Sequence, residues 1–291
     1  MRSRSQLRLI SFTFSLLLHH AAPHASGHGA YHDALDALNV EIAQQPAEPA
    51  LLVKRARLHL SHDEWQAALQ DLERVDRLQP APALTEGLRG AALNLGGQWK
   101  AALFSLNAHL VTHPHDAEAR FQRARSQAHL GDRKAAAADY REALRSHPEP
   151  TAARKAEAAE VIFKHEGADA ALTFLSADPT TATDPETLHC ALTLALQAGL
   201  TDRALSYVAS LQLQAPRPEP WMARAARILA EAGRKEEARA AWLELVAHLQ
   251  ALPNLERGTP LLTPLLHEAQ SALGIRSAQP VIAAPSSTTA P

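Results

Sequence analysis

The sequence is poor in the residues that mark several common classes of protein. Its 291 residues include a single cysteine, and aromatic residues make up only 4% of the chain. One cysteine cannot form an internal disulfide, so a disulfide-stapled scaffold and a cysteine-based zinc finger are both excluded. The formal net charge is only -2, which provides no general electrostatic attraction to nucleic acid. We therefore expect no nucleic-acid partner.

Alanine is what the chain has in abundance. There are 60 alanines, and 46% of the residues are hydrophobic, which is enough apolar material to bury a core. Alanine is the strongest helix former, and its small side chain lets two helices approach closely. The composition predicts a closely packed all-α protein and does not favour an enzyme.

Residues 1–27 have the order of a secretory signal peptide. Three arginines come first, an apolar run over residues 9–18 follows, and the small residues Ala25 and Gly27 come last. The run is shorter than the roughly 20 residues that span a bilayer as a helix. We expect cleavage after Gly27 and export to a bacterial periplasm or to the outside; the alternative is an apolar start that is not cleaved. No later apolar stretch is long enough to insert the mature chain into a membrane.

Four columns of residues recur at a spacing of 34 positions. One column holds prolines: Pro46, Pro80, Pro114, Pro148 and, two periods later, Pro216. A second holds alanine without a miss: Ala34, Ala68, Ala102, Ala136, Ala170, Ala204 and Ala238. A third holds mostly small residues: Ala56, Gly90, Ala124, Ala158, Leu192 and Ala226. The fourth holds Gly97, Gly131, Gly199 and Gly233. Such a period indicates a repeat architecture.

Residues 83–116 show what one period contains. Apolar residues recur at helical spacing up to Leu95, and the pair Gly96 and Gly97 then ends that helix. A second apolar stripe begins at Trp99, and Pro114 prevents its helix from continuing. The repeating unit is therefore predicted to be a helix, a short turn and a second helix.

This pattern resembles the tetratricopeptide repeat family, whose period is 34 residues. The resemblance implies an all-α, right-handed superhelical solenoid of stacked helix–turn–helix repeats. We expect the following organisation after the leader: an N-terminal half repeat at 28–48, six repeats at 49–252, a C-terminal capping helix at 253–276 and a disordered tail at 277–291.

The sequence departs from the repeat pattern at two places, and each departure leads to a structural prediction. Asp63 stands where other repeats have the turn glycine, and aspartate tolerates the left-handed conformation better than most residues. In the fourth repeat the glycine moves to Gly167, and the segment 178–185 contains two prolines that should shorten the second helix.

The resemblance also implies that the first helices of the repeats line a concave groove for a partner. The predicted groove residues are Val53, Arg57, Asn94, Phe121, Arg125, Lys155, His189 and Arg227. Apolar side chains with isolated cations suit an extended peptide or a partner helix. Arg57, Arg125 and Arg227 occupy one position in three repeats. They either hold carboxylates of a partner or pair with acids of the protein itself.

Histidine is plentiful, with 16 residues, and one pair suggests a metal site. Cleavage after Gly27 would place His28 at the new amino terminus, with His32 four residues later. The free amino group and two imidazoles would supply three nitrogen ligands, a set that favours copper(II). The alternative is a frayed, solvated start of a helix.

No motif for catalysis accompanies these features. Cys190 is adjacent to His189, and neighbours in sequence point to different sides of a helix, so they are not a nucleophile and its base. We therefore expect a non-enzymatic, monomeric scaffold in the cell envelope that binds a partner protein or peptide. The alternative function is periplasmic binding or delivery of copper through the histidines at the mature terminus.

Overall fold

The computed structural model describes residues 27–79, 85–146, 150–178 and 182–275. Within these ranges the chain forms fifteen helices and no strand. The predicted all-α repeat fold is confirmed. The leader predicted at 1–27 lies outside the described residues except for Gly27, and the tail predicted at 277–291 lies wholly outside them.

The helices follow one another as six consecutive pairs. The pairs are α2 (Pro49–Leu60) with α3 (Trp65–Leu78), α4 (Glu86–Leu95) with α5 (Trp99–Thr112), α6 (Ala117–His129) with α7 (Arg133–Ser146), α8 (Ala152–Glu166) with α9 (Ala168–Ser176), α10 (Pro185–Gln197) with α11 (Thr201–Gln214), and α12 (Glu219–Glu231) with α13 (Lys235–Ala251). Helix α1 (Gly27–Gln44) precedes them, and α14 (Asn254–Arg257) and α15 (Leu262–Ala272) follow.

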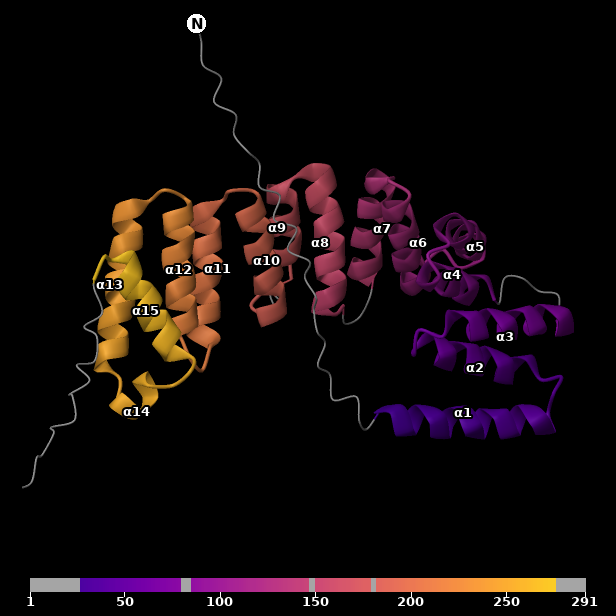
Figure 1. The fold of residues 1–291 in the computed structure, drawn as a ribbon. Coiled ribbons are helices and arrows are strands. Elements are labelled where there is room, and N and C mark those ends of the chain that lie inside the picture. The colour runs from indigo at the N-terminus through magenta and orange to yellow at the C-terminus, as the bar shows by residue number, and fades with distance from the viewer. Residues whose placement is uncertain (1–26, 80–84, 147–149, 179–181, 276–291) are drawn as a thin grey trace, which may run out of the picture.

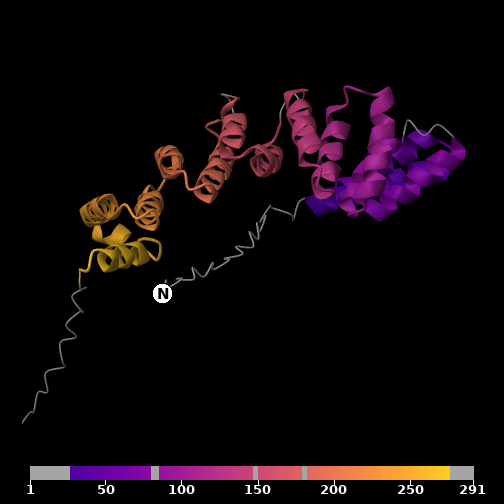
Figure 2. The ribbon, with the colours of Figure 1, turned by 90° about the horizontal axis from the view of Figure 1, so that it is seen from above.

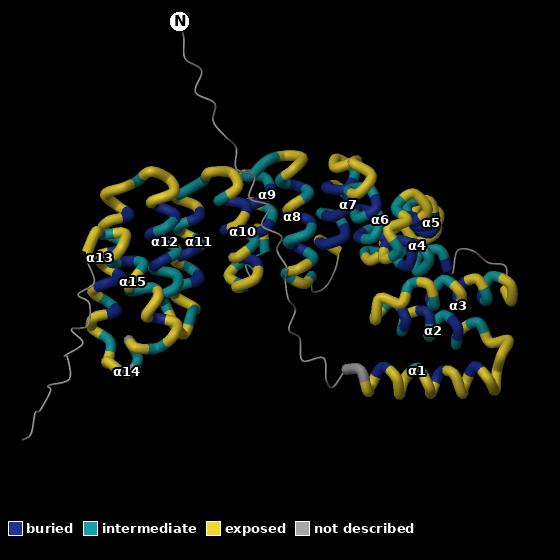
Figure 3. Tube along the Cα trace, viewed as in Figure 1, coloured by how far each residue is buried: buried dark blue, intermediate teal, exposed yellow. Residues whose placement is uncertain are grey.

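The pairs stack into a twisted arc. Figure 1 shows α1 to α3 running across the direction of α11 to α13, so the helix axes rotate along the stack. Seen from above in Figure 2, the same helices follow a curve from one end of the chain to the other. Figure 3 shows the buried residues as short stretches on the helix faces that meet a neighbour. No helix of the described part combines the length and apolarity needed to cross a lipid bilayer.

Each turn between paired helices relies on a residue in the left-handed region. The turn glycines Gly97 and Gly131 have φ values of 69° and 91°, and Asp63 takes the same conformation at φ 61°. Asp63 is the one non-glycine residue with positive φ among the described residues. The expectation that an aspartate takes over the glycine's role in the first repeat is confirmed.

The fourth pair is the irregular one, as expected. Helix α9 has only nine residues and ends at Ser176. Gly167, at φ 93°, serves as both the end of α8 and the start of α9, so almost no turn separates them. The second helix of this repeat is therefore shortened, which confirms the prediction from the segment 178–185.

The column of small residues lies where paired helices touch. Ala56, Ala124, Ala158 and Ala226 are each 0% exposed. At Gly90 the approach is closer still, because a Cβ on that residue would collide with the side chain of Leu106 on α5. The small column thus sets the spacing between the two helices of a repeat.

An arginine that binds both an aspartate and an asparagine of neighbouring helices recurs after two periods. Arg55 donates from Nε to Asp71 Oδ2 over 2.8 Å and from Nη1 to Asn39 Oδ1 over 2.7 Å. The equivalent atoms of Arg123 donate to Asp139 over 2.7 Å and to Asn107 over 3.2 Å. The two aspartates are buried, so the arginines are needed to satisfy their charge.

Candidate functional site

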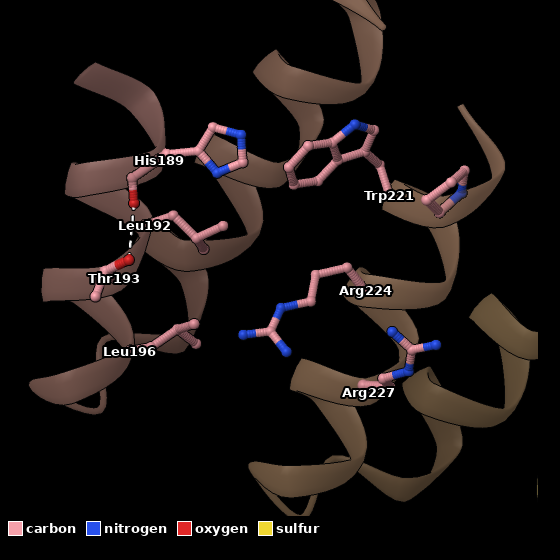
Figure 4. Close-up of a pocket in the computed structure, with 8 residues that line it drawn as sticks. His189, Leu192, Thr193, Leu196, Trp221, Arg224 and Arg227 are labelled. Carbon is pink, nitrogen blue, oxygen red and sulfur yellow. Dashed lines mark hydrogen bonds between the residues drawn. The ribbon is translucent and has the colours of Figure 1, made fainter. Parts of the chain in front are cut away.

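The inner face of the arc carries two hollows lined mainly by first helices. The N-terminal hollow, of about 340 Å³, is bounded by α2, α4 and α6 and includes Arg57, Gly87, Leu88, Glu118 and Gln122. The C-terminal hollow, also about 340 Å³, lies between α10 and α12. It is lined by His189, Leu192, Thr193, Leu196, Pro220, Trp221, Arg224 and Arg227 (Figure 4). These two places are the candidate binding surfaces of the concave face.

Two of the three arginines predicted in the groove are held by the protein itself. Arg125 donates from Nε and Nη2 to the Glu157 carboxylate over 2.8 and 2.7 Å. Arg227 likewise forms a bidentate pair with Glu268 of α15, donating from Nε and Nη2 to the carboxylate over 2.6 and 2.5 Å. Pairing within the protein is therefore the correct interpretation for both.

Arg57 differs from the other two. It is exposed and lines the N-terminal hollow, and within the described residues no carboxylate forms an ion pair with it. The glutamate that binds Arg125 has no counterpart here, because the residue 32 positions after Arg57 is Arg89. The guanidinium of Arg57 faces solvent as an available cation.

Three residues predicted in the groove are buried, and for them the prediction needs correction. Phe121 is 0% exposed, because its ring packs edge-on against Tyr140 and Arg154 lies over it. Asn94 is buried and donates from Nδ2 to the carbonyl of Gln122 over 2.7 Å. Lys155 is buried with its Nζ 2.8 Å from Asp178. These side chains hold neighbouring helices together, and none of them faces the groove.

The other two predicted groove residues differ in exposure. Val53 is half-buried and packs against the small cluster of Ile42, Leu52 and Val75. His189 is exposed and lines the C-terminal hollow, with its ring centre 5.1 Å from that of Trp221. Contact between either of these residues and a partner stays a prediction.

Trp221 and Arg224 were not among the predicted groove residues. Both line the C-terminal hollow, yet neither stands at a position that the repeat pattern assigns to the groove. A signal was present, because the other residues at the position of Trp221 are all smaller: Leu51, Thr85, Ala119, Ala153 and Thr187. Arg224 is half-buried, and among the described residues no carboxylate lies within ion-pair distance of it.

The ion pair between Arg125 and Glu157 affects the pKa of the glutamate. Burial by itself would raise the pKa of Glu157, but hydrogen bonds and charge from Arg125, together with the Tyr140 hydroxyl, hold that pKa below its usual range. A carboxyl group whose pKa is lower in the folded state stabilises the fold above the unfolded-state pKa of about 4.3. That stabilisation is lost as the pH falls through the folded-state pKa.

We expect Glu157→Gln to destabilise the protein at pH 7 and to differ progressively less from the unchanged protein below about pH 4.3. Urea unfolding, followed by circular dichroism at pH 7 and below about pH 4.3, measures the free energy of unfolding of both proteins. Glu160→Gln provides the control, because Glu160 is an exposed glutamate on the same helix. A destabilisation by Glu157→Gln that is as large in acid as at neutral pH would contradict the role given to the Glu157 charge.

The described residues contain no group of three or more histidine, cysteine, aspartate or glutamate side chains placed to hold a metal ion. His32 is exposed on α1, while the side chain of His28 lies outside the described part. The copper site predicted from these two histidines therefore stays a prediction.

The single thiol is poorly suited to nucleophilic chemistry. Burial raises the pKa of Cys190 to about 11, so the thiol is protonated at neutral pH. The neighbouring imidazole of His189 is directed toward Trp221 in the C-terminal hollow (Figure 4). Cys190 thus packs as a small apolar side chain.

Stacked helix pairs with a concave face define an α-solenoid, and the comparisons with known proteins specify its family. The tetratricopeptide repeat family model matches residues 118–150, which span α6 and α7. Residues 118–150 thus match a tetratricopeptide repeat, and the stacked helix pairs have the fold of tetratricopeptide repeat proteins. No curated protein matches it.

Two solved structures share the fold over most of the chain. One is the C-terminal part of a TPR repeat-containing protein from Cytophaga hutchinsonii, 15% identical, with 82% of this chain and 96% of that chain covered and a TM-score of 0.57. The other is a tetratricopeptide repeat protein from Parabacteroides merdae, 16% identical, with 84% and 94% covered and a TM-score of 0.52. At these identities the likeness concerns the fold alone.

Proposed function

We propose that the chain is a non-enzymatic scaffold that binds a segment of another protein along its concave face. The observation that carries the proposal is the contrast among the concave arginines. Arg125 and Arg227 are satisfied by internal glutamates, whereas Arg57 and Arg224 lie in hollows with no carboxylate partner among the described residues. Cations beside apolar walls on a pre-ordered surface suit an extended segment of a partner.

The proposed place of action is the periplasm or the outside of the cell. The support is the order of the leader, in which arginines, an apolar run and small residues follow one another over residues 1–27. The mature protein would begin at His28. Intact mass spectrometry of the protein purified from a periplasmic fraction tests this, and a mass that retains Arg2, Arg4 and Arg8 would exclude cleavage.

Partner capture by crosslinking and mass spectrometry tests the concave face. The double variant Arg57→Glu/Arg224→Glu reverses both available cations, and we expect it to lose the partners that the unchanged protein captures. The matched control is Arg77→Glu/Arg239→Glu, because both of these arginines are exposed on second helices and the change in charge is the same. An identical set of partners for the concave variant and the unchanged protein would refute binding on this face.

A further inference from the structure

The C-terminal hollow is lined by Trp221, the largest side chain at its repeat position. At the position of Trp221, Thr85, Ala119 and Thr187 are buried, Leu51 is half-buried and Ala153 is exposed. The indole of Trp221 is half-buried. Helix α8 packs directly against the next first helix, α10, whereas α12 packs mainly against α11 and α13. The space between α10 and α12 forms the hollow.

The walls of this hollow differ in chemistry. Leu192 and Leu196 of α10 and the indole of Trp221 form an apolar lining. Figure 4 shows Arg224 extending from α12 into the space between the two helices. Its guanidinium has no carboxylate partner within the described ranges. An unneutralised cation thus lies next to apolar surface.

The next arginine along the same helix shows what such a cation binds. Arg227 holds the carboxylate of Glu268 with two hydrogen bonds. Helix α15 presents this glutamate close in sequence to the half-buried Leu265 and Leu266, which pack against the cluster beneath α12. An acidic side chain beside a large apolar one is therefore already accommodated on this part of the protein, at Arg227.

We infer that the C-terminal hollow binds a partner segment in which aspartate or glutamate is next to a large apolar residue. The apolar side chain lies against Leu192, Leu196 and Trp221, and the carboxylate accepts a two-pronged, charge-assisted hydrogen bond from Arg224. This inference rests on the proposed function and adds the chemistry of the segment that is recognised.

Selection from a displayed library tests the inference with defined probes. Random peptides of about twelve residues are fused through their carboxyl termini, so that every carboxylate offered is a side chain. Against the full chain we expect enrichment of an acid next to leucine, isoleucine, methionine or an aromatic residue. Synthetic copies of the enriched peptides should lose roughly tenfold or more in affinity for Arg224→Glu and for Trp221→Ala.

Control variants separate this inference from the proposed function. Arg239→Glu changes an exposed arginine on α13 and should leave the affinity unchanged. Equal affinity for Arg224→Glu and the unchanged protein overturns the inference. If the same peptides lose affinity in Arg57→Glu instead, binding on the concave face stands and the site is the N-terminal hollow. If no peptide is enriched, or neither arginine matters, both proposals fail. Circular dichroism confirms that each variant is folded.

Discussion

Replacing Phe121 with alanine is expected to lower the free energy of unfolding by about 3–5 kcal/mol. The ring is 0% exposed, its centre lies 5.0 Å from that of Tyr140 in an edge-on arrangement, and the guanidinium of Arg154 lies 4.6 Å above it. Truncation removes the apolar contacts and leaves a cavity between α6 and α7 that their close spacing cannot fill. Urea unfolding and hydrogen exchange of α6 and α7 measure the loss.

Phe104→Ala is the matched control for this change. It removes the same atoms from α5, but Phe104 is 78% exposed, so we expect the free energy of unfolding to change by no more than about 0.5 kcal/mol. Because each repeat contacts only its neighbours, the Phe121 variant should lose exchange protection first in the third repeat and the repeats beside it. Equal losses for the two variants would contradict the placement of Phe121 in the core.

Removing helix α15 is expected to have an effect of similar size. Leu262 and Ala269 are fully buried in the cluster that includes Trp242, Leu245 and Leu249. Ending the chain at Leu252 exposes this cluster to water and leaves Arg227 without Glu268. We expect the sixth repeat to lose roughly 3 kcal/mol or more of stability, since truncating one buried leucine costs about 2–5 kcal/mol.

Hydrogen exchange of the truncated chain locates the loss. Protection should fall in α12 and α13 and stay unchanged in α2 and α3, because a solenoid transmits such effects mainly to adjacent repeats. A chain ending at Arg276, which lacks only the predicted tail, is the control and should unfold like the full chain. Unchanged protection of α13 after removal of α15 would refute the capping role.

Most of the fold follows from local features of the sequence. The helix pairs, their turns and their order depend on residues at a fixed spacing, and the same backbone conformation repeats at each turn. Asp63 illustrates the point, because its place in the glycine column was sufficient to predict a left-handed residue, and the structure has φ 61° there. The shortened α9 likewise follows from the displaced Gly167 and the prolines after Asp178.

The candidate site was less predictable, because it depends on how successive repeats are rotated against each other. Position within a repeat does not reveal whether an arginine meets a glutamate of the next helix. Arg125 meets Glu157, but Arg227 meets Glu268, which lies 41 residues away on a helix outside the period. The same limit applies to Phe121 and Lys155, whose shared repeat position predicted a groove and whose neighbours cover them.

The properties of this protein therefore fall into two groups, those determined by the sequence and those decided by the tertiary structure. The sequence by itself determined the repeat fold, the repeat period and the closely spaced helices, because alanine and glycine columns act through short-range contacts that every repeat reproduces. Only the tertiary structure decided which cations remain available, Arg57 and Arg224, and that Trp221 lines a hollow between α10 and α12. These outcomes arise between repeats, where the size and charge of a single side chain on one helix act on its neighbour.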